Sequence, residues 1–141
     1  MVIVDANVLL YAVDSASAHH EPSRSWLDAS LAGTEAVGLA WIALLAFIRI
    51  GTNASILPTP MTPDQATAQV EAWLAAPVAV VAQPTPRHAS LLRGLLRDTG
   101  TAGNLTTDAH LAALALEHGA DIVSYDRDFA RFPGVRHRLP G

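Results

Sequence analysis

The first ten residues of this 141-residue chain are Met1-Val2-Ile3-Val4-Asp5-Ala6-Asn7-Val8-Leu9-Leu10. Its first four residues are apolar and mostly β-branched, which predicts a short buried strand. Asp5 follows this strand directly, and the apolar residues after it predict the start of a helix. In an open α/β sheet, ligands bind outside the carboxyl ends of the strands. Asp5 is therefore a candidate site residue.

Two further aspartates occupy comparable positions. Asp126 follows the predicted strand 121–125, and Asp108 begins the amphipathic stretch 108–115. If both lie at the same sheet edge as Asp5, the three carboxylates repel one another unless a cation neutralises them. Oxygen ligands without thiolates suit Mg²⁺ or Mn²⁺. The pattern therefore predicts a divalent metal site that acts on phosphates.

Strands and helices alternate along the chain, which predicts an α/β fold with a parallel sheet and helices on both faces. We expect one domain, residues 1–141. A threonine, Thr106 or Thr107, is expected to cap the helix that begins at Asp108, and Gly119 to end it. The predicted strands are 1–4, 36–39, 78–82, 121–125 and 135–139, and the predicted helices are 7–12, 21–31, 41–50, 63–75, 88–98 and 108–118.

Composition limits the class of protein. Half of the residues are hydrophobic and 16% are charged, which is typical of a folded domain. No apolar run reaches the length of a membrane span, and no basic region precedes the first apolar residues as in a secretory signal. The absence of cysteine excludes disulfides and thiolate metal sites. We therefore expect a cytoplasmic protein without a membrane segment.

The net charge is −4, so binding to nucleic acid through a broad basic surface is not expected. A local patch is needed instead. Four arginines near the C-terminus form either such a patch or a solvated tail that balances acidic neighbours, namely Arg127, Arg131, Arg136 and Arg138. The chain has no lysine and no Gly-rich phosphate loop, which argues against receiver domains and P-loop proteins. A Mg²⁺-dependent phosphatase of the haloacid dehalogenase type also requires Asp-x-Asp and a lysine, whereas this chain has Asp5-Ala6-Asn7.

Three segments together resemble the PIN domain. Residues 4–12 resemble its opening, residues 103–113 its later acidic helix, and residues 122–129 its final acidic strand end. Their order and spacing, and the length of the chain, resemble a VapC-type toxin ribonuclease, and the match spans nearly the whole chain. The resemblance implies a three-layer α/β/α fold with a central, mostly parallel sheet of four to five strands.

The same resemblance implies an endoribonuclease that depends on Mg²⁺ or Mn²⁺, a VapB-type antitoxin that blocks its site, and a homodimer. By position, Asp5, Asp108 and Asp126 hold the metal, and Asp128 is a further catalytic acid near the rim of the pocket. Two polar residues, Asn104 and Ser124, have supporting roles. A divalent ion there activates water for attack on the RNA phosphodiester and stabilises the phosphoryl charge.

One position departs from the family pattern. PIN domains usually carry a glutamate on the second helix, where this chain has Ala46. Either Asp128 or Asp14 supplies the charge instead, or the site binds one ion more weakly. A second interpretation is a PIN-like binding scaffold without catalytic activity.

The histidines give no clear metal site. His19 and His20 are adjacent, so their side chains diverge, and a solvated loop is the expected location. His110 and His118 are eight positions apart on one predicted helix, too far to share an ion. We expect both to be partly packed or at the surface.

Overall fold

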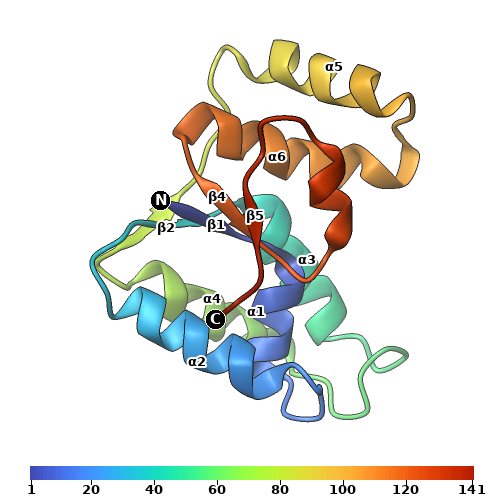
Figure 1. Cartoon of the computed structure of the whole chain (residues 1–141). Coiled ribbons are helices and arrows are strands. Elements are labelled where there is room, and N and C mark those ends of the chain that lie inside the picture. The colour runs from blue at the N-terminus through green and yellow to red at the C-terminus, as the bar shows by residue number, and fades with distance from the viewer.

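The computed structural model describes residues 1–141 and has a five-stranded sheet in which every strand is parallel to its neighbours. The strand order is β3-β2-β1-β4-β5, so β1 lies at the centre (Figure 1). The predicted α/β class and the parallel sheet are confirmed. The strands are β1 (Val2–Val4), β2 (Val37–Leu39), β3 (Ala79–Val81), β4 (Asp121–Val123) and β5 (His137–Arg138).

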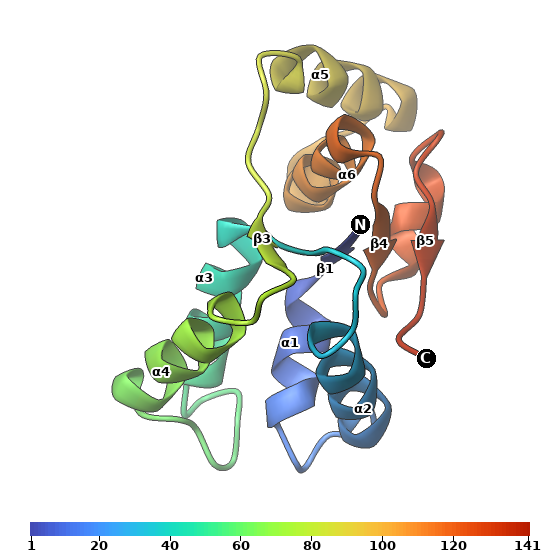
Figure 2. The ribbon, with the colours of Figure 1, turned by 90° about the vertical axis from the view of Figure 1, so that its left-hand side faces the viewer.

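Helices cover both faces of the sheet, as predicted. Figures 1 and 2 show α5 and α6 on one side of the strands and α1, α2 and α4 on the other. None of the helices has the length and apolarity required to span a membrane. The helices are α1 (Ala6–Val13), α2 (His20–Leu31), α3 (Trp41–Gly51), α4 (Pro63–Leu74), α5 (His88–Thr99) and α6 (Thr106–His118), with 3₁₀ turns η1 (Gly103–Leu105) and η2 (Arg127–Arg131).

The central strand contributes to two separate hydrophobic cores. Successive side chains of a strand point to opposite faces. Ile3 accordingly packs into the core under α5 and α6, while Val2 and Val4 pack into the core under α1 to α4. All three side chains are at most 2% exposed. A strand buried on both faces reads as a continuous apolar run, which is why the first residues predict it without alternation.

The pairing of β1 with β2 requires a glycine. Gly38 lies opposite Ile3 in the parallel register. A Cβ atom at position 38 would lie 2.9 Å from Cγ1 of Ile3 and 3.2 Å from the carbonyl oxygen of Val2. The absence of a side chain at Gly38 therefore lets Ile3 fill the core beside it.

The helix ends follow the sequence in part. Thr62 and Gln65 form a capping box at the start of α4, and Gly119 ends α6 in the left-handed conformation at φ 61°. The prediction that a threonine side chain caps α6 is wrong. Leu105 occupies the N-cap position without a side-chain hydrogen bond, because the chain enters α6 from the turn η1. Asp108 consequently lies inside the first turn of α6.

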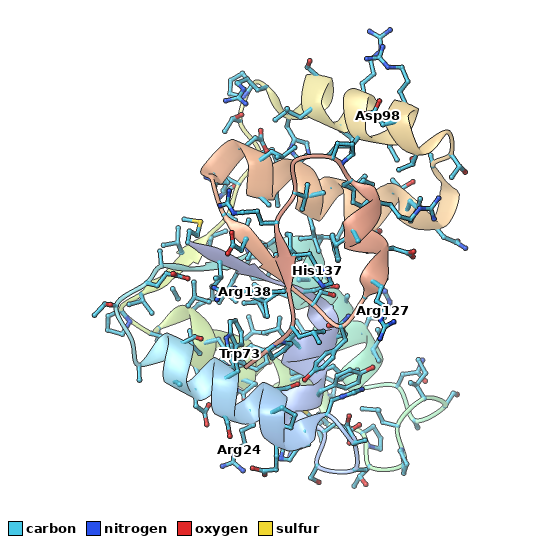
Figure 3. All side chains as sticks on the ribbon, in the orientation of Figure 1. Arg24, Trp73, Asp98, Arg127, His137 and Arg138 are labelled. Atoms are coloured by element: carbon cyan, nitrogen blue, oxygen red, sulfur yellow. The ribbon has the colours of Figure 1, made fainter.

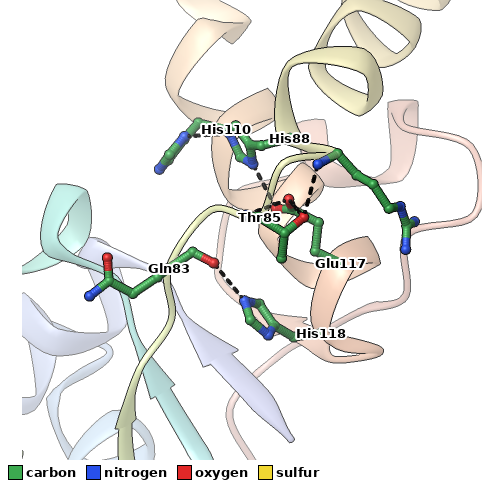
Figure 4. A network of polar contacts seen from close by, with 7 residues as sticks. Gln83, Thr85, His88, His110, Glu117 and His118 are labelled. Carbon is green, nitrogen blue, oxygen red and sulfur yellow. Dashed lines mark hydrogen bonds and ion pairs between the residues drawn. The ribbon is translucent and has the colours of Figure 1, made fainter.

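A buried polar network connects α6 to α5 (Figure 4). The side chain of Glu117 is fully buried, and Oε1 accepts hydrogen bonds from the Thr85 amide at 2.9 Å and the Thr85 hydroxyl at 2.5 Å. Its Oε2 lies 2.6 Å from Nδ1 of His88, whose Nε2 lies 2.9 Å from Nδ1 of His110. The two helices are thus joined by a carboxylate–imidazole–imidazole chain.

Candidate active site

Asp5 is fixed at the junction of β1 and α1. It is the N-cap residue of α1, and its Oδ1 accepts a 2.7 Å hydrogen bond from the amide of Ala6. Its Oδ2 accepts hydrogen bonds from the Ser124 hydroxyl at 2.7 Å and from Nδ2 of Asn7 at 3.3 Å. The strand ends at the carboxyl edge of the sheet, so these contacts hold the carboxylate at that edge.

Ser124 and Asn7 connect this junction to the loop after β4. The fully buried Ser124 hydroxyl oxygen accepts hydrogen bonds from the Asp126 amide at 2.9 Å and from Nδ2 of Asn7 at 3.1 Å. Oδ1 of Asn7 accepts a hydrogen bond from the amide of Tyr125 at 3.2 Å. The supporting role predicted for Ser124 corresponds to these hydrogen bonds, which join Asp5 to the loop that carries Asp126. The role of Asn7 was not predicted, although it lies two residues after Asp5.

The second acidic segment differs from its prediction. The strand β4 ends at Val123, so Asp126 lies beyond it, at the N-cap of η2. Oδ1 of Asp126 accepts a 2.9 Å hydrogen bond from the amide of Asp128. This is an Asx turn, and such turns form because a short acidic side chain reaches the backbone two residues ahead. The turn places Asp126 and Asp128 side by side.

The aspartates predicted from the sequence converge. Helix α6 runs back across the sheet, so its first turn, with Asp108, lies at the carboxyl edge of the strands. Carboxylate oxygens of Asp108, Asp126 and Asp128 all lie within 4.8 Å of one another, and each residue is half-buried. Asp5 is near enough for its charge to act on Asp108. Asp128, expected near the rim, is thus one of the three most closely grouped acids.

This convergence raises the pKa of two aspartates. Burial, followed by the charge of Asp126 and a hydrogen bond with it, raises the pKa of Asp108 to about 7, and the charges of Asp5 and Asp128 add to the effect. Burial is also the largest cause of the raised pKa of Asp5, against the lowering effect of the hydrogen bonds from Ser124 and Ala6. At neutral pH the site therefore favours positive charge, either protons or a cation.

The donor set fits a hard divalent cation. The grouped ligand atoms of Asp108, Asp126 and Asp128 are carboxylate oxygens, the ligand type of Mg²⁺ and Mn²⁺. The imidazole of His137, a residue that the sequence pattern does not indicate, lies 2.8 Å from the Ser124 carbonyl oxygen, and its charge acts on Asp5. The spacing of these ligand atoms, within 4.8 Å of one another, is compatible with a single bound ion.

Two other polar residues make no side-chain hydrogen bond or ion pair with the four aspartates. Asn104 is exposed in η1, and no hydrogen bond connects its side chain to the aspartates. Asp14 is at the opposite end of α1 from Asp5, roughly 13 Å along the helix axis. It therefore cannot supply the charge that Ala46 lacks. Helix α3, which carries Ala46, contributes no carboxylate at all.

Three of the four C-terminal arginines lie in ion pairs with aspartates. Arg136 and Arg138 pair with Asp121 at 2.5 Å and 3.6 Å, and Arg131 lies 3.9 Å from Asp128. These contacts favour the interpretation of a surface that balances acidic neighbours. Of the four arginines, Arg127 alone is exposed without an ion pair.

The histidines fall into separate environments. His20 belongs to α2, its side chain is 14% exposed, and its Nδ1 lies 2.9 Å from the Tyr11 carbonyl oxygen. The predicted solvated loop is therefore wrong for His20, whereas His19 is exposed. His118 contacts the Gln83 carbonyl oxygen, whereas His110 contacts His88. His110 and His118 therefore do not share a site.

Comparison with known proteins agrees with this geometry. The sequence model of the PIN domain matches residues 2–135. Ribonuclease VapC37 of Mycobacterium tuberculosis is 56% identical over 99% of this chain and 97% of its own length. Ribonuclease VapC33 of the same species is 40% identical over 99% of this chain and 98% of its own length.

Solved structures share the fold at low sequence identity. VapC20 of Mycobacterium tuberculosis, a sarcin–ricin loop cleaving toxin, has a TM-score of 0.69 at 17% identity, covering 96% of this chain and 99% of that one. DNA-bound VapBC of Salmonella typhimurium has a TM-score of 0.69 at 20% identity, covering 99% of this chain and 98% of that one. From the family match and the close relatives together, this chain belongs to the PIN domain family, among the VapC proteins.

Proposed function

We propose that this protein is a metal-dependent endoribonuclease that acts as the toxin of a VapBC-type pair. The observation that carries the proposal is the convergence of Asp5, Asp108, Asp126 and Asp128 at the carboxyl edge of a parallel sheet. The names of the relatives that match over almost the entire chain support the same activity.

Within this proposal, Asp5, Asp108 and Asp126 hold Mg²⁺ or Mn²⁺. When bound, the ion supplies charge for stabilising the phosphoryl group and for activating water. The protein's own contribution is to fix the carboxylates before substrate arrives, because Ser124 and Asn7 orient Asp5 and the Asx turn orients Asp126. Asp126 or Asp128 accepts the proton that the attacking water loses.

The proposed partners follow from the family. A ribonuclease cuts the RNA of the cell that makes it unless its site is blocked. A VapB-type antitoxin that covers the aspartates would block access of RNA. Structures of VapBC pairs with the same fold support such an assembly. We also propose that the protein forms a homodimer and acts in the cytoplasm.

One observation favours a second function. Helix α3 carries Ala46 and no acidic residue, so it adds no carboxylate to the four aspartates. A weakened metal site would leave a PIN-like scaffold that binds without cutting. The grouping of the acids, which repel one another unless a cation is bound, favours the enzyme.

Cleavage of mixed RNA by the purified protein with Mn²⁺, with and without chelator, tests the proposal. Asp108→Asn should reduce the rate roughly a hundredfold or more, because the variant lacks a carboxylate that holds the charge-stabilising ion. Asp98→Asn is the matched control, because Asp98 is exposed on α5 (Figure 3). RNA left intact by wild-type protein in excess would favour the scaffold, and equal cutting by the Asp108 variant would refute the metal site.

A further inference from the structure

Three aromatic rings from segments that flank the acidic site contact one another. The imidazole of His19 stacks on the ring of Tyr125, with centroids 4.3 Å apart and an interplanar angle of 29°. The ring of Tyr11 lies 5.4 Å from His19 and 5.5 Å from Tyr125. We call these three residues the aromatic cluster. Its members come from α1, from the connection between α1 and α2, and from the loop after β4.

The inner side of the aromatic cluster is fixed by hydrogen bonds. The Tyr125 hydroxyl lies 2.8 Å from the hydroxyl of Ser23, which is fully buried on α2. The Tyr11 carbonyl oxygen is 2.9 Å from Nδ1 of His20. His19, by contrast, is exposed, while both tyrosines are half-buried. The cluster therefore consists of one ring held by its hydroxyl, Tyr125, a second half-buried ring, Tyr11, and one ring that borders solvent, His19.

The aromatic cluster is connected directly to the aspartates. Tyr125 lies between Ser124, which binds Asp5, and Asp126, and its amide donates to Asn7. Tyr11 follows Asn7 by one turn of α1, roughly 6 Å along the helix axis. Tyr11 and Tyr125 therefore belong to the same two segments that carry Asp5 and Asp126.

The unpaired Arg127 adds a positive charge to the same loop. It follows Asp126 directly, and Figure 3 shows it projecting from the start of η2. Proteins that bind single-stranded nucleic acid combine a positive charge, which attracts phosphate, with aromatic rings that stack on bases. Here the exposed Arg127 and the exposed ring of His19 offer these two features. The protein as a whole is acidic, so a neutral stacking surface is a way to gain affinity without a broad basic face.

We propose that His19, supported by Tyr11 and Tyr125, is a stacking platform for one base of single-stranded RNA next to the phosphodiester that is cut. This inference rests on the proposed ribonuclease function and assigns it a positioning residue. Stacking is tolerant of base identity because every base has a π-face. The platform would therefore set where the strand lies more than which base it accepts.

A purely structural role for the aromatic cluster predicts different behaviour. If the rings only close the junction of α1 and α2, loss of His19 should change stability and leave RNA affinity unaltered. Loss of the Tyr125 hydroxyl in Tyr125→Phe breaks the contact with Ser23 and keeps the ring. The pair of variants therefore separates stacking from packing.

The test measures binding of short homopolymeric RNA strands of adenosine, cytidine and uridine by fluorescence anisotropy. All variants carry Asp108→Asn so that cleavage does not interfere. His19→Ala should weaken binding about five-fold to a hundred-fold, the size of the effect for one stacked base. His19→Phe should restore it, and Tyr125→Phe, which keeps the ring but loses the contact with Ser23, should weaken binding less than His19→Ala does. His118→Ala is the matched histidine control, because His118 contacts the Gln83 carbonyl instead.

The second measurement is cleavage kinetics, for which the substitutions are made in protein that keeps Asp108. His19→Ala should raise KM with little change in kcat, since uniform binding is lost. Unchanged affinity and KM in His19→Ala, with wild-type protein that cuts RNA, would overturn the platform and leave the ribonuclease standing. Wild-type protein that neither cuts nor binds RNA would overturn both.

Discussion

The Ser124 hydroxyl donates a 2.7 Å hydrogen bond to Oδ2 of Asp5 and thereby ties the end of β4 to the start of α1. The same oxygen accepts the amide of Asp126, so one fully buried serine positions two of the four acids. Its bond also lowers the pKa of Asp5, against the larger raising effect of burial. Orientation of the site thus depends on a neutral side chain.

Ser124→Ala should destabilise the protein by about 1–3 kcal/mol, because a buried carboxylate oxygen and an amide lose their partner. RNA cleavage should fall as well, since Asp5 is no longer held. Urea unfolding and cleavage assays measure the two effects. Ser25→Ala is the matched control on the exposed side of α2 and should stay within about 0.5 kcal/mol of wild type. A Ser124 variant as stable as the Ser25 variant would contradict this assignment.

Metal-free protein should lose stability as the pH rises through neutrality. Burial and neighbouring charges raise the pKa of Asp108 from 3.8 to about 7 in the folded protein. A carboxyl with a raised pKa contributes its full stability at pH values below the unfolded pKa. This contribution is lost as the pH rises through the folded pKa. Asp108→Asn should remove a destabilisation on the order of 1–2 kcal/mol at about pH 8, after allowance for partial exposure.

Thermal unfolding in EDTA between about pH 5 and pH 8 measures this effect, with Asp98→Asn as the exposed control. The Tm of wild type and of the Asp98 variant should decline together across this range, and that of Asp108→Asn should decline less. Mn²⁺ should restore the wild-type Tm at the upper end. Parallel curves for all three proteins would show that Asp108 does not titrate as described.

Acid should weaken the contact between α5 and α6. Burial tends to raise the pKa of Glu117, but the hydrogen bonds from His88 and Thr85 outweigh it and hold the pKa below its ordinary value of 4.5. Burial and the charge of His88 lower the pKa of His110 below 6.5. Both groups contribute their full stability at pH values above their pKa in the unfolded chain. This contribution is lost as the pH falls through their lower pKa in the folded protein.

Glu117→Gln should therefore destabilise the protein by about 1–3 kcal/mol at neutral pH, because Thr85 and His88 lose a charged acceptor. The difference from wild type should shrink below about pH 4. Hydrogen exchange of α5 amides reports the local effect, and Glu71→Gln, at an exposed position of α4, is the control. Unchanged protection of α5 would argue against this network as the link between the helices.

Gly38→Ala should destabilise the protein by about 1–3 kcal/mol, since the new methyl group meets Ile3 and the Val2 carbonyl in the central sheet. Gly94→Ala has the opposite expectation. No atom lies within 4 Å of a Cβ at Gly94, which is inside α5, so alanine should stabilise by about 0.5–1 kcal/mol. Equal effects at both positions in urea unfolding would show that the approach of β1 and β2 is not tight.

Much of the fold follows from local pattern. The strands near 2–4, 37–39 and 79–81 are short apolar runs, and the capping box at Thr62 marks the start of α4 within the sequence itself. The start of α6 was misplaced because a 3₁₀ turn of Gly103–Leu105 has no hydrophobic period. The end of β4 was placed too late because Ser124 and Tyr125 look like strand residues but belong to the loop of the site.

The acidic residues of the site could be predicted from the sequence, but the residues that hydrogen-bond around them could not. An aspartate after an apolar run is visible locally, so Asp5 and Asp126 stand out. The contact of Asn7 with Ser124 joins residues 117 positions apart, and nothing local identifies a carboxamide as its partner. His137 reaches the same region only because β5 pairs with β4. Such long-range partners become visible when the sheet order is known.

The most direct test of the central claim is the anomalous scattering of Mn²⁺ in crystals of the wild-type protein. The account predicts a peak among the carboxylates of Asp5, Asp108, Asp126 and Asp128, and loss of that peak in Asp108→Asn crystals. Crystals soaked in Mn²⁺ that show no peak at these residues, or a peak unaffected by the substitution, would contradict it.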